Sequence, residues 1–183
     1  VYDVSITGIT SANGSLSLGF AGAQNITDSS SNALAVTAPS GANESYTLDN
    51  QAPGLTAVAV SGSTLTLSYN EALASGSVPA GSDYTVLVDG VPVSVTGVTI
   101  NGSDVELTLA SAVLNTAAVT LSYTPGAAPL QDATGNTVAS LSNTAVTNNS
   151  ADAIAPTVLS VVRQSPLAAT TNADTVTFRV SFD

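Results

Sequence analysis

The stretch LTAVAVSGSTLTLSY, residues 55–69, decides the fold class of this chain. On both sides of Ser61-Gly62, large apolar side chains alternate with small or polar ones, which is the period of a strand with one buried face. Two such runs joined by a short break that contains glycine are typical of a β-hairpin. The stretch therefore predicts two neighbouring antiparallel strands that share one buried face.

The same alternation recurs along the chain, and no helical period is sustained over ten residues. Turn-forming pairs such as Asp89-Gly90 and Asn101-Gly102 separate the runs, and such pairs suit the backbone of tight hairpin turns. About seven short strands in 100 residues, with turns every 8–12 residues, predict an all-β fold of the immunoglobulin-like sandwich type. The other alternating runs are residues 84–88, 91–95, 105–109 and 119–123, with 2–6 and 176–182 towards the ends.

An internal repeat divides the chain. The segment NITDSSSNALA (25–35) aligns with PLQDATGNTVA (129–139), so that Asp28 and Asp132 lie 104 residues apart. A period of about 100 residues is typical of a tandem array of sandwich domains. The period predicts three parts: the C-terminal half of one repeat (1–50), a complete repeat (51–150) and the N-terminal half of the next (151–183). We therefore expect a window on a longer array of tandem immunoglobulin-like β-sandwiches.

The composition excludes several classes of function. The 183 residues include 2 Lys+Arg and 13 Asp+Glu, which gives a formal charge of −11, and there is no His, Cys, Met or Trp. Thiol and imidazole catalysis, disulfides and the usual zinc sites are thereby excluded. Arg163 and Arg179 alone cannot build the positive surface that nucleic acids or anionic membranes bind. The sequence contains no run of about 20 apolar residues, so it gives no indication that this segment inserts into a membrane.

Four segments resemble tandem bacterial immunoglobulin-like repeats of giant surface adhesins, and the central unit resembles the SwmB-type repeat. These segments are LDNQAP (48–53), LTLSYNEAL (65–73), LQDATGNTVAS (130–140) and DAIAPTVLSV (152–161). The resemblance implies secreted or surface-anchored proteins with roles in adhesion, biofilms, sheaths or motility, often with Ca²⁺ at the joints between domains. One departure is Ser31, which stands where the D-x-x-G-N loop usually carries glycine and which we expect to weaken that turn.

The topology of such a sandwich predicts a candidate metal site at the joint between repeats. The linker, the end of the second strand and the loop after the sixth strand share one pole of the fold. Three carboxylates there repel one another unless they are protonated or bridged by a cation, and Ca²⁺ takes six to eight oxygen ligands. The candidate ligands are Asp49, Asn50, Glu71, Asp132 and Asn136 in the central unit, with Asp28, Asn32, Asp152 and Asp183 in the flanking halves.

A simpler interpretation of the same residues stays open. Asp and Asn side chains often hydrogen-bond to their own backbone and so stabilise turns without any metal. Asp183 in the last half-unit does not match the candidate ligand Glu71. When Tyr69-Asn70 is aligned with Phe182-Asp183, Asp183 takes the position of Asn70.

The leading functional hypothesis is a non-enzymatic structural segment of an extracellular bacterial surface protein, with neighbouring repeats and other copies of itself as partners. The alternative is a self-assembling filament subunit whose terminal half-domains are completed by neighbouring chains, although about 30 residues would be missing from each composite domain. A ligand-binding tip is disfavoured because the chain has no Trp. A hydrolase is disfavoured because the acidic clusters of the chain recur in each repeat, whereas a catalytic pair of carboxylates rarely recurs in every unit of an array.

Overall fold

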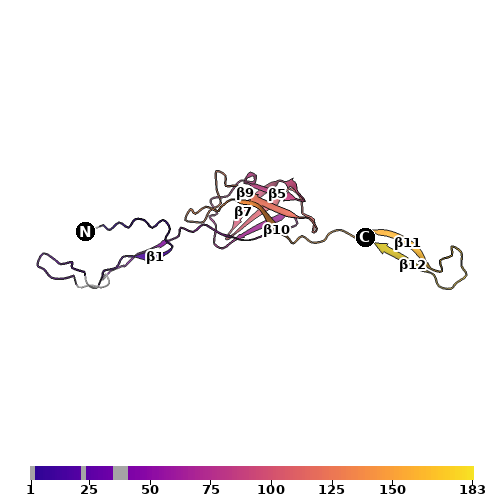
Figure 1. Cartoon of the computed structure of the whole chain (residues 1–183), viewed down its shortest axis with the longest axis horizontal. Coiled ribbons are helices and arrows are strands. Elements are labelled where there is room, and N and C mark those ends of the chain that lie inside the picture. The colour runs from indigo at the N-terminus through magenta and orange to yellow at the C-terminus, as the bar shows by residue number, and fades with distance from the viewer. Residues whose placement is uncertain (1–2, 22–23, 35–40) are drawn as a thin grey trace.

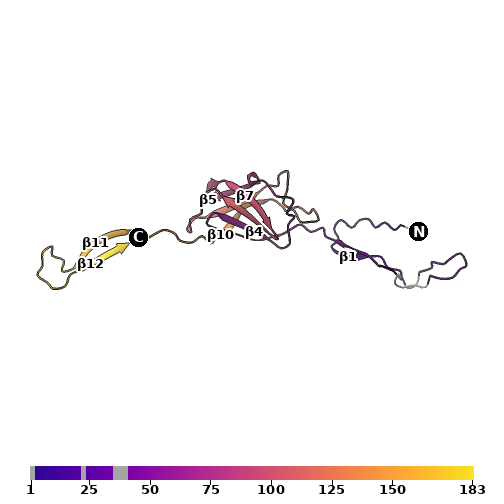
Figure 2. The ribbon, with the colours of Figure 1, turned by 180° about the vertical axis from the view of Figure 1, so that it is seen from behind.

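The computed structural model describes residues 3–21, 24–34 and 41–183. Tyr2 and Ala35, which belong to the predicted strand 2–6 and the predicted repeat 25–35, lie outside the described residues. A central β-sandwich lies between two β-hairpins, as Figure 1 and the reverse view in Figure 2 show. The hairpin on the N-terminal side pairs β1 (Gly14–Ser17) with β2 (Ser45–Leu48), and the C-terminal hairpin pairs β11 (Val158–Ser165) with β12 (Thr177–Phe182).

The central sandwich is one hydrogen-bonded set of eight strands in the order β6-β5-β9-β10-β3-β4-β8-β7. Strand β10 links the two layers, because it pairs antiparallel with β9 and parallel with β3. The strands are β3 (Leu55–Ser61), β4 (Thr64–Tyr69), β5 (Tyr84–Val88), β6 (Val91–Val93), β7 (Val95–Asn101), β8 (Asp104–Leu109), β9 (Val119–Tyr123) and β10 (Leu141–Asn148), with the 3₁₀ turn η1 (Gly81–Asp83) before β5. The predicted all-β fold and its sandwich arrangement are confirmed.

The core of the sandwich consists of the residues that the alternating pattern placed on one face. Leu65, Leu67, Leu107, Leu121 and Tyr123 are fully buried, and each comes from a strand whose intervening residues are more exposed. Because burial of a Leu side chain contributes roughly 1.5–3 kcal/mol, these alternating positions supply much of the driving force for folding. In a chain without disulfides, this core carries the stability of the unit.

The first five residue pairs of the C-terminal hairpin match those of the β3–β4 hairpin, and the last pair differs by a second register shift in β11–β12. Val161 lies opposite Val180 in β11–β12, as Val58 lies opposite Leu67 in β3–β4. Both hairpins also have a register irregularity after their first pair. The repeat that the sequence suggested therefore extends to the hydrogen-bond register of the strands.

The three sheets keep to the three predicted parts of the chain. Strands β1 and β2 lie within residues 1–50, the eight-stranded set within 51–150, and β11 and β12 within 151–183. Where each domain begins and ends stays a prediction. In the described ranges we find no helix with the length and hydropathy of a membrane span.

Candidate metal centre

The loop after β9 is shaped by Asp132, which is only 3% exposed. Its Oδ1 atom accepts hydrogen bonds from the backbone N–H groups of Thr134 (2.8 Å), Gly135 (2.7 Å) and Asn136 (2.9 Å), and from the Thr134 hydroxyl (2.9 Å). Gly135 has φ = +97°, a left-handed conformation that glycine adopts without steric cost. The turn chemistry that the sequence left open is therefore present at Asp132.

Asn136 connects this loop to the linker that precedes β3. Its Nδ2 group donates to Oδ2 of Asp132 at 2.7 Å and to the backbone carbonyl of Asp49 at 3.2 Å. The Thr134 hydroxyl lies 3.5 Å from the same carbonyl. The linker therefore lies directly against the loop, and this brings the Asp49 side chain to the same pole of the sandwich as Asp132.

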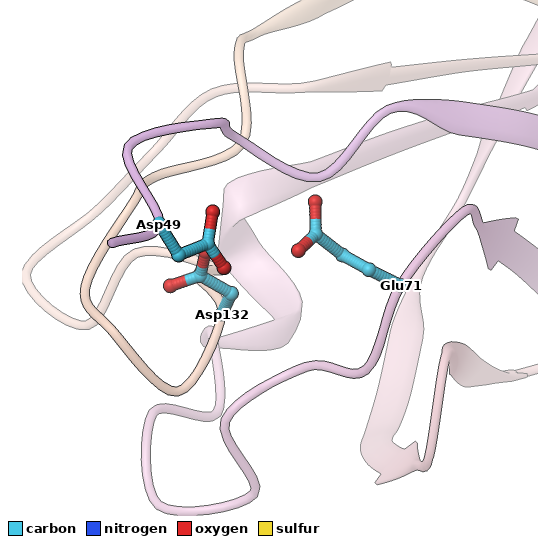
Figure 3. A group of neighbouring side chains, drawn as sticks. All are labelled: Asp49, Glu71 and Asp132. Atoms are coloured by element: carbon cyan, nitrogen blue, oxygen red, sulfur yellow. The ribbon is translucent and has the colours of Figure 1, made fainter. Parts of the chain in front are cut away.

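Asp49, Glu71 and Asp132 form a three-carboxylate group at this pole. One oxygen atom from each of the three lies within 4.8 Å of the others. Figure 3 shows the Asp49 and Asp132 carboxylates side by side, with Glu71 reaching towards them from the chain that follows β4. Asp132 is buried, whereas Asp49 and Glu71 are half-buried. Three of the candidate ligands named from the sequence therefore lie close together, and their binding of a cation stays a prediction.

The group has a strong local excess of negative charge. Burial raises the pKa of Glu71, and the nearby Asp49 and Asp132 carboxylates raise it further. Burial also pushes the pKa of Asp132 upwards, but the hydrogen bonds from Asn136 and Thr134 outweigh this effect and hold that pKa below its ordinary value. Asp132 is therefore ionised at neutral pH, and its charge disfavours ionisation of Glu71.

The donor set fits a hard divalent cation. Ca²⁺ binds carboxylate oxygens at about 2.3–2.6 Å, so two oxygens on one ion lie at most about 5 Å apart, and the 4.8 Å limit of this group meets that condition. The only two basic residues of the sequence, Arg163 and Arg179, belong to the β11–β12 hairpin. No Lys or Arg of the central unit is available to neutralise the three carboxylates.

Asn50 takes a different position from the one that the sequence suggested. Its Nδ2 group donates to the carbonyl of Ala12 at 2.6 Å and of Ile9 at 3.4 Å, and its backbone N–H donates to Oδ1 of Asn13 at 2.6 Å. These contacts fasten the linker to the preceding half-unit. Asp49 and Asn50 are neighbours in sequence, yet one joins the central sandwich and the other joins the segment before it.

Asp28 and Asn32 rebuild the Asp132 loop within the first half-unit. Oδ1 of Asp28 accepts from the N–H groups of Ser30 and Asn32 at 2.9 Å each, and Asn32 Nδ2 donates to Oδ2 of Asp28 at 2.9 Å. These bonds lower the pKa of Asp28, with the Asn32 side chain as the largest cause. The pair lies apart from the three-carboxylate group, so the structure shows a second copy of the turn and not a further ligand of the same site.

Ser31 occupies the position of Gly135 in this second loop. It has φ = +66°, a left-handed conformation that is unfavourable for a residue with a Cβ atom. The substitution that the sequence singled out is therefore accommodated with backbone strain.

Asp152 and Asp183 also match positions in the central unit. Oδ1 of Asp152 accepts from the N–H of Ile154 at 3.0 Å, as Oδ1 of Asp49 accepts from Gln51 at 3.2 Å. Asp152 is thus the linker aspartate of the next repeat, and it lies outside the three-carboxylate group.

Asp183 instead has the role of Asn70, as the sequence alignment indicated. Its carboxylate accepts from the backbone N–H (2.7 Å) and hydroxyl (2.6 Å) of Thr157, just as Oδ1 of Asn70 accepts from the N–H of Gly54 at 2.7 Å. The hydrogen bonds from Thr157 lower the pKa of Asp183. Asp183 therefore closes the open end of the β11–β12 hairpin.

Sequence reasoning missed the part that Thr134 plays in the loop. Its hydroxyl bonds to Asp132 and lies near the carbonyl of Asp49. The signal was present, since a hydroxyl residue two positions after an aspartate often completes such a turn. The first half-unit has Ser30 at the matching position.

The fold and the site define a class of protein. A complete sandwich with register-matched parts of the same unit on either side identifies a tandem-repeat β-sandwich protein. Residues 48–128 match the profile of the SWM repeat, which is described as a flagellar system-associated repeat. The central segment is therefore similar to this repeat, and the predicted resemblance to the SwmB-type repeat is confirmed.

Two solved structures of S-layer proteins are similar to part of this chain. The crystal structure of the N-terminal part of the bacterial S-layer protein SbsC is 13% identical, has a TM-score of 0.44, and the match covers 62% of this chain and 26% of that one. The S-layer protein rSbsC(31-844) is 12% identical with the same TM-score, and the match covers 62% and 15%. The chain thus spans about a quarter of the first structure. No curated protein matches the chain.

Proposed function

We propose that this chain is a non-enzymatic structural segment of an extracellular bacterial surface protein, an adhesin, sheath or filament, in which Ca²⁺ stiffens the joint between repeats. The observation that carries the proposal is the shared carboxylate group, because Asp49 comes from the linker whereas Glu71 and Asp132 come from the following sandwich. The repeat family, described as flagellar system-associated, supports a role outside the cell.

The geometry of the linker supports a mechanical role. On one side the Asn50 amide binds the carbonyls of Ile9 and Ala12, and on the other the Asn136 amide binds the carbonyl of Asp49. The linker is thus held from both repeats before any ion is added. A cation held by Asp49, Glu71 and Asp132 would supply the missing positive charge and would cross-link the linker to the sandwich.

The calcium hypothesis is tested by calorimetric melting of the chain in Ca²⁺ and in a chelator. At a free Ca²⁺ concentration about 100-fold above Kd, binding to the folded state alone adds about 2.7 kcal/mol, which corresponds to a rise in Tm on the order of 10–20 °C for a domain of this size. Asp132→Asn should abolish the rise, whereas Glu106→Gln on the exposed face of β8 should preserve it. Identical Tm values in Ca²⁺ and chelator would reject the calcium site.

Homotypic contacts are the second part of the proposal. The segment just after β1 and the β11–β12 hairpin leave large apolar side chains exposed, among them Leu18 and Phe20 in the first and Phe178 and Phe182 in the second. Exposed apolar surface of this kind marks interaction sites. This observation favours end-to-end contacts between copies, in line with the filament alternative from the sequence.

A further inference from the structure

The peptide group between Asp49 and Asn50 is hydrogen-bonded on both of its edges. Its carbonyl, which belongs to Asp49, accepts from Nδ2 of Asn136 at 3.2 Å in the loop after β9. Its N–H, which belongs to Asn50, donates to Oδ1 of Asn13 at 2.6 Å in the loop before β1. The carbonyl and the N–H of a trans peptide point in opposite directions from one rigid plane. A single plane therefore lies between the central sandwich and the first half-unit and is bonded to each.

The contacts of the linker alternate between these two bodies residue by residue. Leu48 ends β2 and pairs with β1 in the first half-unit. Asp49 turns both its carbonyl and its carboxylate to the central sandwich. Asn50 then returns to the first half-unit, where its amide binds the carbonyls of Ile9 and Ala12. Because one residue spans at most about 3.6 Å, the linker has no slack at this point, and neither body can turn without breaking bonds to the plane.

The loops on the two sides of the plane are themselves closed by hydrogen bonds. In the loop before β1, the N–H of Ala12 donates at 3.0 Å to the carbonyl of Ile9, which also accepts from Asn50. In the loop after β9, the Asn136 amide that binds the plane also binds Oδ2 of Asp132 at 2.7 Å. Hydrogen bonds in series polarise and strengthen one another. A continuous path of such bonds therefore runs from one loop through the peptide plane to the other.

We propose that the Asp49–Asn50 peptide group couples the two repeats energetically, so that the loop before β1 is held closed only while the loop after β9 is intact. Asn13 and Asn136 are the positioning residues of this coupling, because they bind opposite edges of the same plane. Coupling between two sites is reciprocal, so a change on either side reaches the other. The inference rests on the proposed structural role of the joint, and it needs no ion, because the bonds to the plane join neutral groups.

The opposite end of the central sandwich supplies a matched control. Asn148, at the end of β10, donates through Nδ2 to the carbonyls of Leu114 and Ala117 at 2.7 and 2.9 Å. This clamp resembles that of Asn50, but its donor and its acceptors belong to one repeat. Asn148 lies opposite Val60 near the end of β3, whereas the linker leads into the start of that strand. Asn148→Ala therefore removes two comparable bonds far from the peptide plane.

Hydrogen exchange of single amides, measured by NMR in chelator, tests the coupling. Asn136→Ala should speed exchange of the Ala12 amide several-fold, although the two residues belong to different repeats. Reciprocally, Asn13→Ala should speed exchange of the Gly135 amide, which is hydrogen-bonded within the loop after β9. Asn148→Ala should leave the exchange of Ala12 unchanged. Because Asn13 lies outside the central sandwich, its variant keeps that sandwich folded, and an unchanged Gly135 amide in Asn13→Ala overturns the proposal by itself.

The double variant Asn13→Ala/Asn136→Ala separates coupling from independent effects. If both bonds act through one plane, the second loss adds little to the first, so the fold-changes of the single variants do not multiply. Fold-changes in the exchange of Ala12 that do multiply overturn the proposal, as does an acceleration in Asn148→Ala equal to that in Asn136→Ala. Every rate is measured in chelator, so a failure of the coupling is distinguishable from a failure of the calcium site, which the melting experiment decides.

Discussion

The side-chain amide of Asn136 donates a hydrogen bond to the backbone carbonyl of Asp49, 87 residues earlier in the chain, at 3.2 Å. The same amide binds Oδ2 of Asp132 at 2.7 Å. One side chain thus ties the linker to the loop that shapes the carboxylate group. The joint between the linker and the sandwich is therefore partly built by neutral hydrogen bonds, independently of any ion.

Replacing this amide should loosen the linker. We expect Asn136→Ala to destabilise the central unit by about 1–3 kcal/mol, because it leaves the buried Asp132 with fewer donors, and to speed hydrogen exchange of the linker amides. The matched control is Asn32→Ala, which removes the same bond to Asp28 in the first half-unit and should leave the melting of the sandwich unchanged. Equal effects of the two variants would contradict a role of Asn136 at the joint.

Glu71 should have opposite effects with and without calcium. In chelator, Glu71→Gln should raise Tm, because burial and the charges of Asp49 and Asp132 disfavour the ionised carboxylate in the folded state. In Ca²⁺ the same variant should melt below the wild type, because a ligand is lost. The measurement is calorimetry in both buffers, and a variant that is more stable in both speaks against a cation at this site.

The pH dependence of stability in chelator follows from the raised pKa of Glu71. The pKa of Glu71 is higher in the folded state than its ordinary value of 4.5. Glu71 therefore does not destabilise the folded state below about pH 4.5, and its destabilising effect builds up as the pH rises through the raised pKa. For Asp132 the pKa is lowered, so its contribution to stability is present above about pH 3.8 and is lost as the pH falls. We expect the difference in Tm between Glu71→Gln and the wild type to vanish at acid pH.

The position shared by Ser31 and Gly135 allows a reciprocal exchange. Gly135→Ser should destabilise the central sandwich by about 1–2 kcal/mol, because φ = +97° is unfavourable for a residue with a side chain. Ser31→Gly should relieve the strain at φ = +66° and slow hydrogen exchange of the Asn32 amide, which is bonded to Asp28. If the two exchanges change stability in the same direction, the two loops are not equivalent.

The hydroxyl groups of three core tyrosines should contribute differently to the free energy of unfolding. Within the described residues, the buried hydroxyls of Tyr69 and Tyr84 have no hydrogen-bond partner, whereas the Tyr123 hydroxyl accepts from the N–H of Leu130 at 2.8 Å. Tyr84→Phe should therefore leave stability unchanged or raise it, and Tyr123→Phe should cost about 1–3 kcal/mol. Urea denaturation of the two variants measures the difference, and a large loss in Tyr84→Phe would contradict the unpaired hydroxyl.

The same cluster predicts alkaline unfolding. Burial raises the pKa of Tyr69 and Tyr84 well above the ordinary value of 10. Their contribution to stability is complete below about pH 10 and is lost as the pH rises beyond it, because the unfolded state ionises first.

Much of the fold could be predicted because the apolar period has a simple physical cause. Leu65 and Leu67 alternate with threonine and serine, and only a strand with one buried face explains that spacing. The offset of 104 residues between Asp28 and Asp132 likewise led to the repeated loop, since in both copies the Asp carboxylate accepts from the Asn four residues later.

The position of Asn50 could not be predicted in this way. Asp49 and Asn50 are adjacent, and the sequence does not show to which neighbouring repeat each side chain turns, because that depends on the path of the linker between two bodies. The hydrogen bonds of Asn50 to Ile9 and Ala12 are set by tertiary structure. The roles of Asp183 and Thr157 at the start of the last hairpin are of the same kind, although the alignment with Asn70 pointed to them.

Isothermal titration of the chain with Ca²⁺ tests the central claim most directly. Only the central unit brings three carboxylates together in the described part of the chain, so the account predicts one Ca²⁺ per chain and no binding to Asp132→Asn. Absence of binding to the unmodified chain, or binding that survives unchanged in Asp132→Asn, would contradict a calcium-stiffened joint.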